Sequence, residues 1–454
     1  MIRALDPQLC SGYFDLVQNP VEMKLYILGF LLAIVWQEQH VNAFQSGKVL
    51  TALPRTTRQI KTLQDMIISL EVVLWKPDDV EFIKKSEEVH FYVNDSYVDR
   101  VKTFLNQNQI IFRVLVEDVE DLIKQQTIND TFTSKQNVNN TFNPRSSSSY
   151  YQRYHSLPEI YYWIDVLTEA HADMLEKIHI GSSFEKRPLY VLKLSTKQNT
   201  SKNAIWIDCG IHAREWVSPA FCLWFIGYAT QFYGKQAKIT KLLNHLDFYV
   251  MPVLNVDGYD YTWKKNRMWR KNRSLHEGNG CFGTDLNRNF ASKHWCEVGA
   301  SNSSCKEIYC GPYPESEPEV KAVTSFIRRN LNHIKAYITL HSYSQMVLFP
   351  YSYTLSQSKD HEELSLLASQ AAQAILRVNE NIYYEYGPGA STIYLSPGGS
   401  DDWAYDMGIK YSFTIELRDK GQYGFLLPES FIKPTATETF AAIYTIASHV
   451  ILKT

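Results

Sequence analysis

The first part of the chain, between residues 44 and 127, switches repeatedly between the hydrophobic periods of strands and helices. Residues 55–70 and 96–105 place apolar side chains three and four positions apart, which predicts two amphipathic helices. Four short apolar runs have the pattern of strands: 48–53, 72–75, 89–93 and 110–116. The order strand, helix, strand, strand, helix, strand is that of a split βαβ unit. The pattern therefore predicts a small α+β open sandwich of the ferredoxin-like type, followed by a short helix at 117–126.

A polar segment follows at residues 127–151, TINDTFTSKQNVNNTFNPRSSSSYY. It has few aliphatic side chains, so it buries too little apolar surface to offset chain entropy and is predicted to be an exposed linker. Proteases cleave such linkers readily. Arg145, between a proline and four serines, is the candidate cleavage point for a trypsin-like protease. An ordinary interdomain linker with an incidental arginine is the alternative interpretation.

From residue 146 to the end, strongly apolar strand patterns alternate with longer helical patterns. The predicted strands are AIWID (204–208), FYVMPV (248–253), KAYITL (335–340) and YSFTIEL (411–417). The predicted helices are 216–233, 317–330 and 361–376. This alternation predicts an α/β domain in which helices cover both faces of one mixed, twisted sheet.

The segment from Met23 to Ala43 has the pattern of a signal peptide. One lysine precedes an apolar run from Leu25 to Trp36, and the segment ends on the small residue Ala43. The apolar run is too short to span a bilayer. We therefore expect export, with cleavage after Ala43 and no membrane span. Residues 1–22 contribute nothing to such a signal and are interpreted as a doubtful extension upstream of the initiator Met23.

The overall composition points to no nucleic-acid or lipid partner. The chain has 46 basic and 48 acidic residues and a formal net charge of −2, so no bulk field draws it to polyanions. Seven cysteines leave an even number once Cys10 in the extension is set aside, and no Cys-x-x-Cys pair occurs. In an exported chain this favours disulfides, although spacing alone does not select the pairing. Asn-x-Ser/Thr sequons agree with export: Asn94, Asn129 and Asn139 as glycosylation candidates, then Asn199, Asn272 and Asn302.

Residues with metal-binding chemistry lie where predicted strands end. His212 follows AIWID, His341 ends KAYITLH, and Glu416 lies in YSFTIEL on the face of Thr414. Ligands bind beyond the carboxyl ends of strands in open α/β sheets. Two histidines and a carboxylate are the protein ligands of catalytic zinc, and His212, Glu215 and His341 supply this set. Taken alone, His-x-x-Glu is a weak signal, because a histidine at a strand end is more often structural.

Other catalytic motifs are absent from the sequence. It has no His-Glu-x-x-His, no Gly-x-Ser-x-Gly elbow and no Gly-rich phosphate loop, so serine hydrolase and nucleotide-binding interpretations lack support. The run KKNRMWRKNR (264–273) holds six basic residues in ten. It is interpreted either as a solvated face or as a heparin-type patch, apart from any member that serves catalysis.

A series of motifs resembles the zinc metallocarboxypeptidases similar to carboxypeptidases A and B. The motifs are HAREW at 212, NVDGYDYTWKKNRMWRKNR at 255, GTDLNRNF at 283, ITLHSYSQ at 338, GGSDDWAYD at 398 and FTIELRDKGQYGF at 413. They occur in family order across nearly all of 146–454. The resemblance implies the zinc carboxypeptidase fold for 146–454 and an activation propeptide with its linker at 44–145, preceded by the signal peptide at 23–43.

The resemblance also implies a role for each site residue. One zinc ion per chain is expected on His212, Glu215 and His341. Glu416 matches the general base, and Arg270 matches the residue that polarises the scissile carbonyl. The remaining matches contact substrate: Asn287 and Arg288 at its terminal carboxylate, Tyr394 as a mobile cap, and Arg214 and Tyr343 in outer subsites.

Asp401 is expected to set the specificity. In the family the matching residue lies at the base of the side-chain pocket, apolar in the A-type enzymes and acidic in the B-type enzymes. The resemblance therefore implies removal of C-terminal Arg and Lys. A local alternative is that Ser400 caps the following helix while Asp401 and Asp402 face its dipole, and this alternative suffices for Asp402.

The resemblance further implies disulfides, an activator and a substrate. The expected disulfides are Cys209–Cys222, Cys281–Cys305 and Cys296–Cys310. Cleavage after Arg145 by a trypsin-like protease is expected to release the enzyme, with thrombin or plasmin as the activator in the plasma branch of the family. That branch implies an extracellular protein of plasma that trims partly degraded fibrin and so slows fibrinolysis. A digestive enzyme similar to carboxypeptidase B and a catalytically silent binding module are the alternatives.

Overall fold

The computed structural model describes residues 46–70, 72–128, 149–196, 202–276 and 280–453. The expected signal peptide, the cleavage point Arg145 and the sequons at Asn129 and Asn139 lie outside these ranges. Among the described residues, none of the helices is long and apolar enough to cross a membrane.

The N-terminal part of the described chain forms a four-stranded antiparallel sheet with the order β2-β3-β1-β4. Its strands are β1 (Gly47–Leu53), β2 (Val73–Lys76), β3 (Val89–Asn94) and β4 (Ile111–Val116). Its helices are α2 (Thr57–Ser69), α3 (Asp95–Gln107) and α4 (Val119–Thr127). Side chains of Thr56, Asn94 and Asp118 accept a backbone N–H at the start of each helix, so local capping fixes where the helices begin. The ferredoxin-like prediction is confirmed.

The C-terminal part is built on an eight-stranded mixed sheet with the order β11-β10-β12-β9-β7-β8-β6-β5. The strands are β5 (Leu175–Ser182), β6 (Pro188–Leu194), β7 (Asn203–Cys209), β8 (Leu246–Met251), β9 (Ile334–Ser342), β10 (Met346–Phe349), β11 (Glu385–Pro388) and β12 (Tyr411–Leu417). The central strands β12, β9, β7 and β8 run parallel, whereas β10 and β6 pair antiparallel with their inner neighbours. The parallel centre matters for function, because its strands end together at one edge of the sheet.

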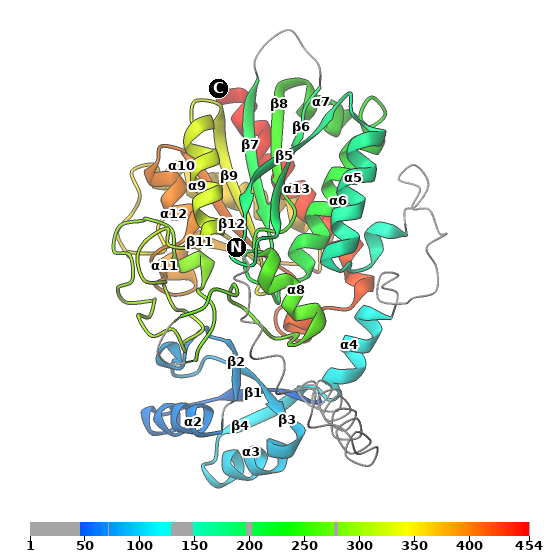
Figure 1. Ribbon diagram of the computed structural model, residues 1–454. Coiled ribbons are helices and arrows are strands. Elements are labelled where there is room, and N and C mark those ends of the chain that lie inside the picture. The colour runs from blue at the N-terminus through cyan, green and yellow to red at the C-terminus, as the bar shows by residue number, and fades with distance from the viewer. Residues whose placement is uncertain (1–45, 71, 129–148, 197–201, 277–279, 454) are drawn as a thin grey trace, which may run out of the picture. The chain divides into compact units, whose positions relative to one another are not determined.

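Helices cover both faces of this sheet (Figure 1). The helices of this part are α5 (Leu157–Ala170), α6 (Val217–Phe232), α7 (Ala237–His245), α8 (Val256–Lys264), α9 (Pro318–Asn330), α10 (His361–Val378), α11 (Gly389–Thr392), α12 (Ser400–Asp406) and α13 (Ile432–Lys453). In β8, the ring of Phe248 packs on Phe225 of α6, whereas the next residue, Tyr249, packs on Phe326 of α9. Since consecutive strand residues face opposite sides, α6 and α9 lie on opposite faces, which confirms the predicted layers.

The three expected disulfides, Cys209–Cys222, Cys281–Cys305 and Cys296–Cys310, are present. The first ties the end of β7 to α6, and the other two bind together the long loop that follows α8.

Three sequons lie among the described residues, and Asn302 is the exposed one of the three. Asn272 is fully buried and its amide donates to Glu317 and Glu319, so it cannot carry a glycan in the folded protein. Asn94 is half-buried, and its side-chain oxygen accepts from Ser96 at the start of α3. Glycosylation of Asn94 stays a prediction.

Candidate active site

The predicted catalytic residues meet at the carboxyl edge of the parallel strands. Glu416 in β12 lies directly opposite His341 in β9, and β9 is the neighbour of β7, after which His212 follows in the turn. These residues and Glu215 line one cavity of about 390 Å³. Thr414 lines it as well, in agreement with the predicted face of β12.

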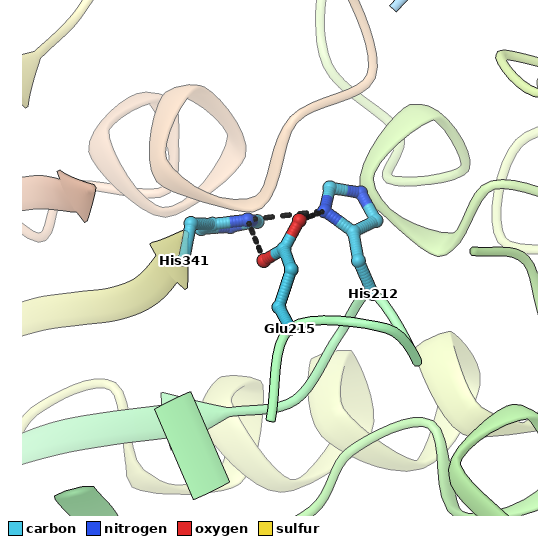
Figure 2. A group of neighbouring side chains, drawn as sticks. All are labelled: His212, Glu215 and His341. Atoms are coloured by element: carbon cyan, nitrogen blue, oxygen red, sulfur yellow. Dashed lines mark hydrogen bonds and ion pairs between the residues drawn. The ribbon is translucent and has the colours of Figure 1, made fainter. Parts of the chain in front are cut away.

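His212, Glu215 and His341 point toward one another from two different segments (Figure 2). The two Nδ1 atoms lie 3.2 Å apart, and the Glu215 carboxylate lies 2.8 Å from His212 Nδ1 and 3.2 Å from His341 Nδ1. Zinc bonds of about 2.0–2.1 Å in a tetrahedron place ligand atoms about 3.3 Å apart. The spacing and the donor set therefore fit zinc, and these residues form the group of potential metal ligands found among the described residues.

The outward nitrogens of both imidazoles are also held. His212 Nε2 lies 3.1 Å from the carboxylate of Asp285, and His341 Nε2 lies 3.3 Å from the hydroxyl of Thr339. Thr339 in turn donates to Asp208 at 2.7 Å. Such partners orient metal-binding histidines and fix their tautomers. Sequence analysis missed Asp285, although it lies inside the motif GTDLNRNF.

Two buried arginines beside these residues form an anion clamp. Arg270 donates from Nε and Nη2 to Asp285, at 3.2 and 3.0 Å, and the guanidinium of Arg288 is fixed by the backbone oxygen of Gly299 at 2.9 Å. Burial raises the pKa of Asp285, but the charges around it, Arg270 foremost, hold that pKa well below its usual range. Asn287 lies next to Arg288 in the same cavity wall. The clamp therefore presents fixed positive charge to an anion.

In this state the clamp holds a carboxylate of the chain itself. Asp78, between β2 and the turn at Val80–Phe82, accepts from Arg270 at 3.2 and 3.0 Å and lies 3.5 Å from Arg288. The hydroxyl of Tyr394 also donates to Asp78. The three side chains expected to handle substrate thus bind one carboxylate from the N-terminal sheet.

Aromatic side chains near Asp78 in the N-terminal domain make further contacts with the residues around the cavity. Phe82 stacks on Tyr394 with ring centres 5.4 Å apart, and His90 lies 2.9 Å from the hydroxyl of Tyr343. Trp75 packs on Phe425 with ring centres 5.1 Å apart. The N-terminal sheet therefore covers both Tyr394 and Tyr343.

Asp401 lines the cavity as a buried carboxylate. Thr414 donates to it at 3.0 Å, but none of the ion pairs found in the described residues includes it. Burial raises the pKa of Asp401 above its usual range. A lone carboxylate at this depth is suited to a cationic partner.

The local interpretation of the helix start was wrong in part. Gly399 caps α12, whereas Ser400 is its first residue and makes no side-chain cap bond. Asp402 is not merely a dipole partner, since its carboxylate accepts the backbone N–H groups of Ser352 and Tyr353. Asp402 therefore has a structural role, because it holds the backbone of Ser352, which lines the cavity.

The basic run at 264–273 is mostly interior. Arg267 stacks on Trp216 at 3.7 Å and donates to the backbone oxygen of Phe425, while Lys271 is also buried. Of the run, Lys264 and Lys265 are exposed. The interpretation of the whole run as a polyanion-binding patch is therefore wrong.

Arg214 is fully buried and is absent from the cavity lining. It lies over the ring of Phe425 at 4.2 Å and donates to the backbone oxygen of Leu74 in β2 at 3.5 Å. An outer-subsite role for Arg214 requires departure of the N-terminal sheet.

Comparisons with known proteins agree with this geometry. The zinc carboxypeptidase family model matches residues 160–442, and the carboxypeptidase activation peptide model matches residues 50–126. Human carboxypeptidase B2 is 65% identical over 430 residues, which covers 94% of this chain and 99% of the relative. Human carboxypeptidase B is 44% identical over 408 residues, covering 90% and 94%. The crystal structure of thrombin activatable fibrinolysis inhibitor superposes with a TM-score of 0.87 at 65% identity, covering 90% of this chain and 100% of that one.

Proposed function

This chain belongs to the zinc carboxypeptidase family, and from that premise we propose that His212, Glu215 and His341 hold one zinc ion per chain beside Glu416. The chain is the zymogen of a B-type carboxypeptidase, which acts on basic C-terminal residues. The main support for these residue roles is that the four side chains line one cavity together with Arg270 and Arg288.

Each residue of the cavity has a distinct task in peptide hydrolysis. Zinc bound there supplies a Lewis acid, which polarises a carbonyl and makes water acidic near neutral pH. Glu416 takes a proton from the attacking water and returns it to the leaving amine. Burial raises the pKa of Glu416, which brings this carboxylate closer to the range in which a group both accepts and donates a proton. Arg270 stabilises the negative charge that develops on the carbonyl oxygen.

The anion clamp explains why only a C-terminal residue is removed. The planar fork of Arg288, with Asn287 beside it, suits a carboxylate, and Tyr394 closes over the bound end. Asp78 supports this assignment, because a carboxylate already lies against Arg270, Arg288 and Tyr394. An internal peptide bond offers no such charge and would leave the guanidinium of Arg288 unpaired.

The similarity to carboxypeptidase B2 supports a proposal for the substrate and the setting. We place the propeptide at 44–145 and the enzyme at 146–454, with cleavage after Arg145 by thrombin or plasmin and export through the signal at 23–43. The enzyme then removes Lys and Arg from partly degraded fibrin in plasma and slows fibrinolysis. The greater identity to carboxypeptidase B2 than to carboxypeptidase B favours this role over digestion. Tyr343 and Arg214 serve the outer subsites once the propeptide has left.

A single assay tests the proposed function. Hydrolysis of a peptide ending in Arg is measured before and after trypsin treatment, with and without a zinc chelator. We expect activity to appear on cleavage, to disappear with the chelator and to return when zinc is added back. Activity that does not respond to the chelator would contradict the metal assignment, and hydrolysis of internal bonds would contradict the clamp.

The substitution Asp78→Asn should weaken the latency of the uncleaved chain. It removes the charge that pairs with Arg270 and Arg288, and a charge-assisted bond of this kind contributes roughly 1.5–3 kcal/mol. We expect uncleaved Asp78→Asn to hydrolyse a small substrate ending in Arg about tenfold or more faster than the uncleaved parent. Steady-state rates before trypsin treatment measure the effect.

The matched control is Asp65→Asn, which changes an exposed carboxylate on helix α2 of the same N-terminal domain. It should leave the latency unchanged. If Asp78→Asn is as inactive as the parent before cleavage, while both are equally active afterwards, the carboxylate of Asp78 does not maintain latency.

A further inference from the structure

The residue after Asp78 makes a second charged contact with the catalytic domain. Asp79 accepts from Lys306 Nζ at 3.1 and 3.3 Å, and its side chain is only 7% exposed. The same carboxylate caps the turn Val80–Phe82 by accepting the N–H of Glu81 at 3.1 Å. Two consecutive acidic residues thus bind two separate cationic sites, the clamp and Lys306.

Lys306 is held at a defined position. It directly follows Cys305, which is bonded to Cys281, and its backbone N–H donates to the oxygen of Ser303 at 3.0 Å. Its side chain is 39% exposed, so the charge borders solvent. Within the described ranges, Asp79 is the carboxylate that forms an ion pair with Lys306.

Asp79 directly follows Asp78, so Lys306 lies within reach of a side chain one residue away from the carboxylate that the clamp binds. Consecutive Cα atoms lie about 3.8 Å apart, so an acidic side chain within a few residues of a clamped carboxylate reaches Lys306. A peptide that binds with its terminal carboxylate at Arg288 carries its preceding residues out of the cavity toward solvent. When the propeptide leaves, Lys306 loses its partner and becomes available to such residues.

We propose that Lys306 determines specificity in the released enzyme by favouring substrates with Asp or Glu close upstream of the C-terminal residue. This proposal rests on the proposed function, since it assumes that the terminal carboxylate of a substrate binds at the clamp. The acidic side chain of the substrate occupies the place that Asp79 holds in the zymogen. Because Lys306 is partly solvated, the expected preference is modest, about two- to fivefold in kcat/KM.

The test uses the full chain after activation with trypsin. The probes are capped hexapeptides ending in Arg, with Asp, Ala or Lys placed in turn at the second, third and fourth positions from the C-terminus. At the position that reaches Lys306, we expect the kcat/KM ratio of Asp to Ala peptides to be about two to five. The ratio should fall to about one in Lys306→Ala and below one in Lys306→Glu, which should prefer Lys.

The matched control is Lys264→Ala, which removes another ion-paired lysine, bound to Asp260 on α8. It should keep the parental ratio. Raising the salt concentration should lower the ratio in the parent but leave it unchanged in Lys306→Ala.

The outcomes separate the two proposals. An Asp preference that is absent from the parent, or that persists in Lys306→Ala, overturns the role of Lys306. If the activated parent cleaves none of the peptides that end in Arg, the proposed function itself fails.

Discussion

Glu416→Gln should lower kcat of the activated enzyme by about 10²- to 10⁴-fold, the usual contribution of a positioned general base. Glutamine has nearly the same shape as glutamate but cannot take a proton from water at neutral pH. Glu416 lies opposite His341 in the parallel pair β12 and β9, so the substitution leaves the backbone of the site in register. Hydrolysis of a peptide ending in Arg after trypsin treatment measures the loss.

The control for this prediction separates chemistry from metal binding. Glu416→Gln should retain about one zinc per chain and should still bind a C-terminal Arg inhibitor, because neither the ligands nor the clamp has changed. His341→Ala should instead lose zinc as well as activity, since it removes one of the three ligands. If Glu416→Gln keeps more than about a tenth of the parental kcat, another group serves as the base.

Asp401→Ile should reverse the specificity of the activated enzyme. Leaving a buried charge without its partner costs roughly 3–5 kcal/mol, which corresponds to a loss of about 10²- to 10⁴-fold in kcat/KM for substrates ending in Arg or Lys. The same change makes the pocket apolar, so hydrolysis of peptides ending in Leu or Phe should rise. The measurement is the ratio of kcat/KM for paired peptides that differ only in the last residue.

Asp406→Asn provides the matched control on the same helix, α12. Asp406 is exposed and contacts the hydroxyls of Tyr351 and Tyr353 rather than the cavity. It should leave the preference for Arg unchanged. Unchanged hydrolysis of a C-terminal Arg by Asp401→Ile would remove Asp401 from the specificity pocket.

Local patterns predicted the N-terminal sheet well because its elements are short and amphipathic. In α2, Leu63, Met66 and Ile67 are buried on one face, as their spacing requires. In the larger domain the buried central strands were recognised by their apolar runs. Strands β5, β6, β10 and β11 were not among the predicted elements. The last two are only four residues long, and a run such as Glu385–Pro388 carries no clear period.

For the candidate site as well, the sequence predicted some features and missed others. Strand ends brought His212, Glu215 and His341 together as a candidate metal set, because the ends of parallel strands meet. His-x-x-Glu alone is a weak signal, and the resemblance of HAREW and ITLHSYSQ to family motifs completed the prediction. Asp285 was missed because its link to His212 spans 73 positions and leaves no local signal. Gly399 was missed as a helix cap because Ser400 is the better capping residue by composition alone.

The sequence by itself determined the elements, the metal-binding residue types and, through family resemblance, the likeness to a zymogen of this class. Only the tertiary structure decided which charges are paired and which are buried. Lys264 and Arg267 look alike in one basic run, yet the first is exposed and the second lies against Trp216. Asp78 and Arg270 lie 192 positions apart and still share two hydrogen bonds. The energy of a charge depends on its solvation and its neighbours in space, and these exist only after the chain has folded.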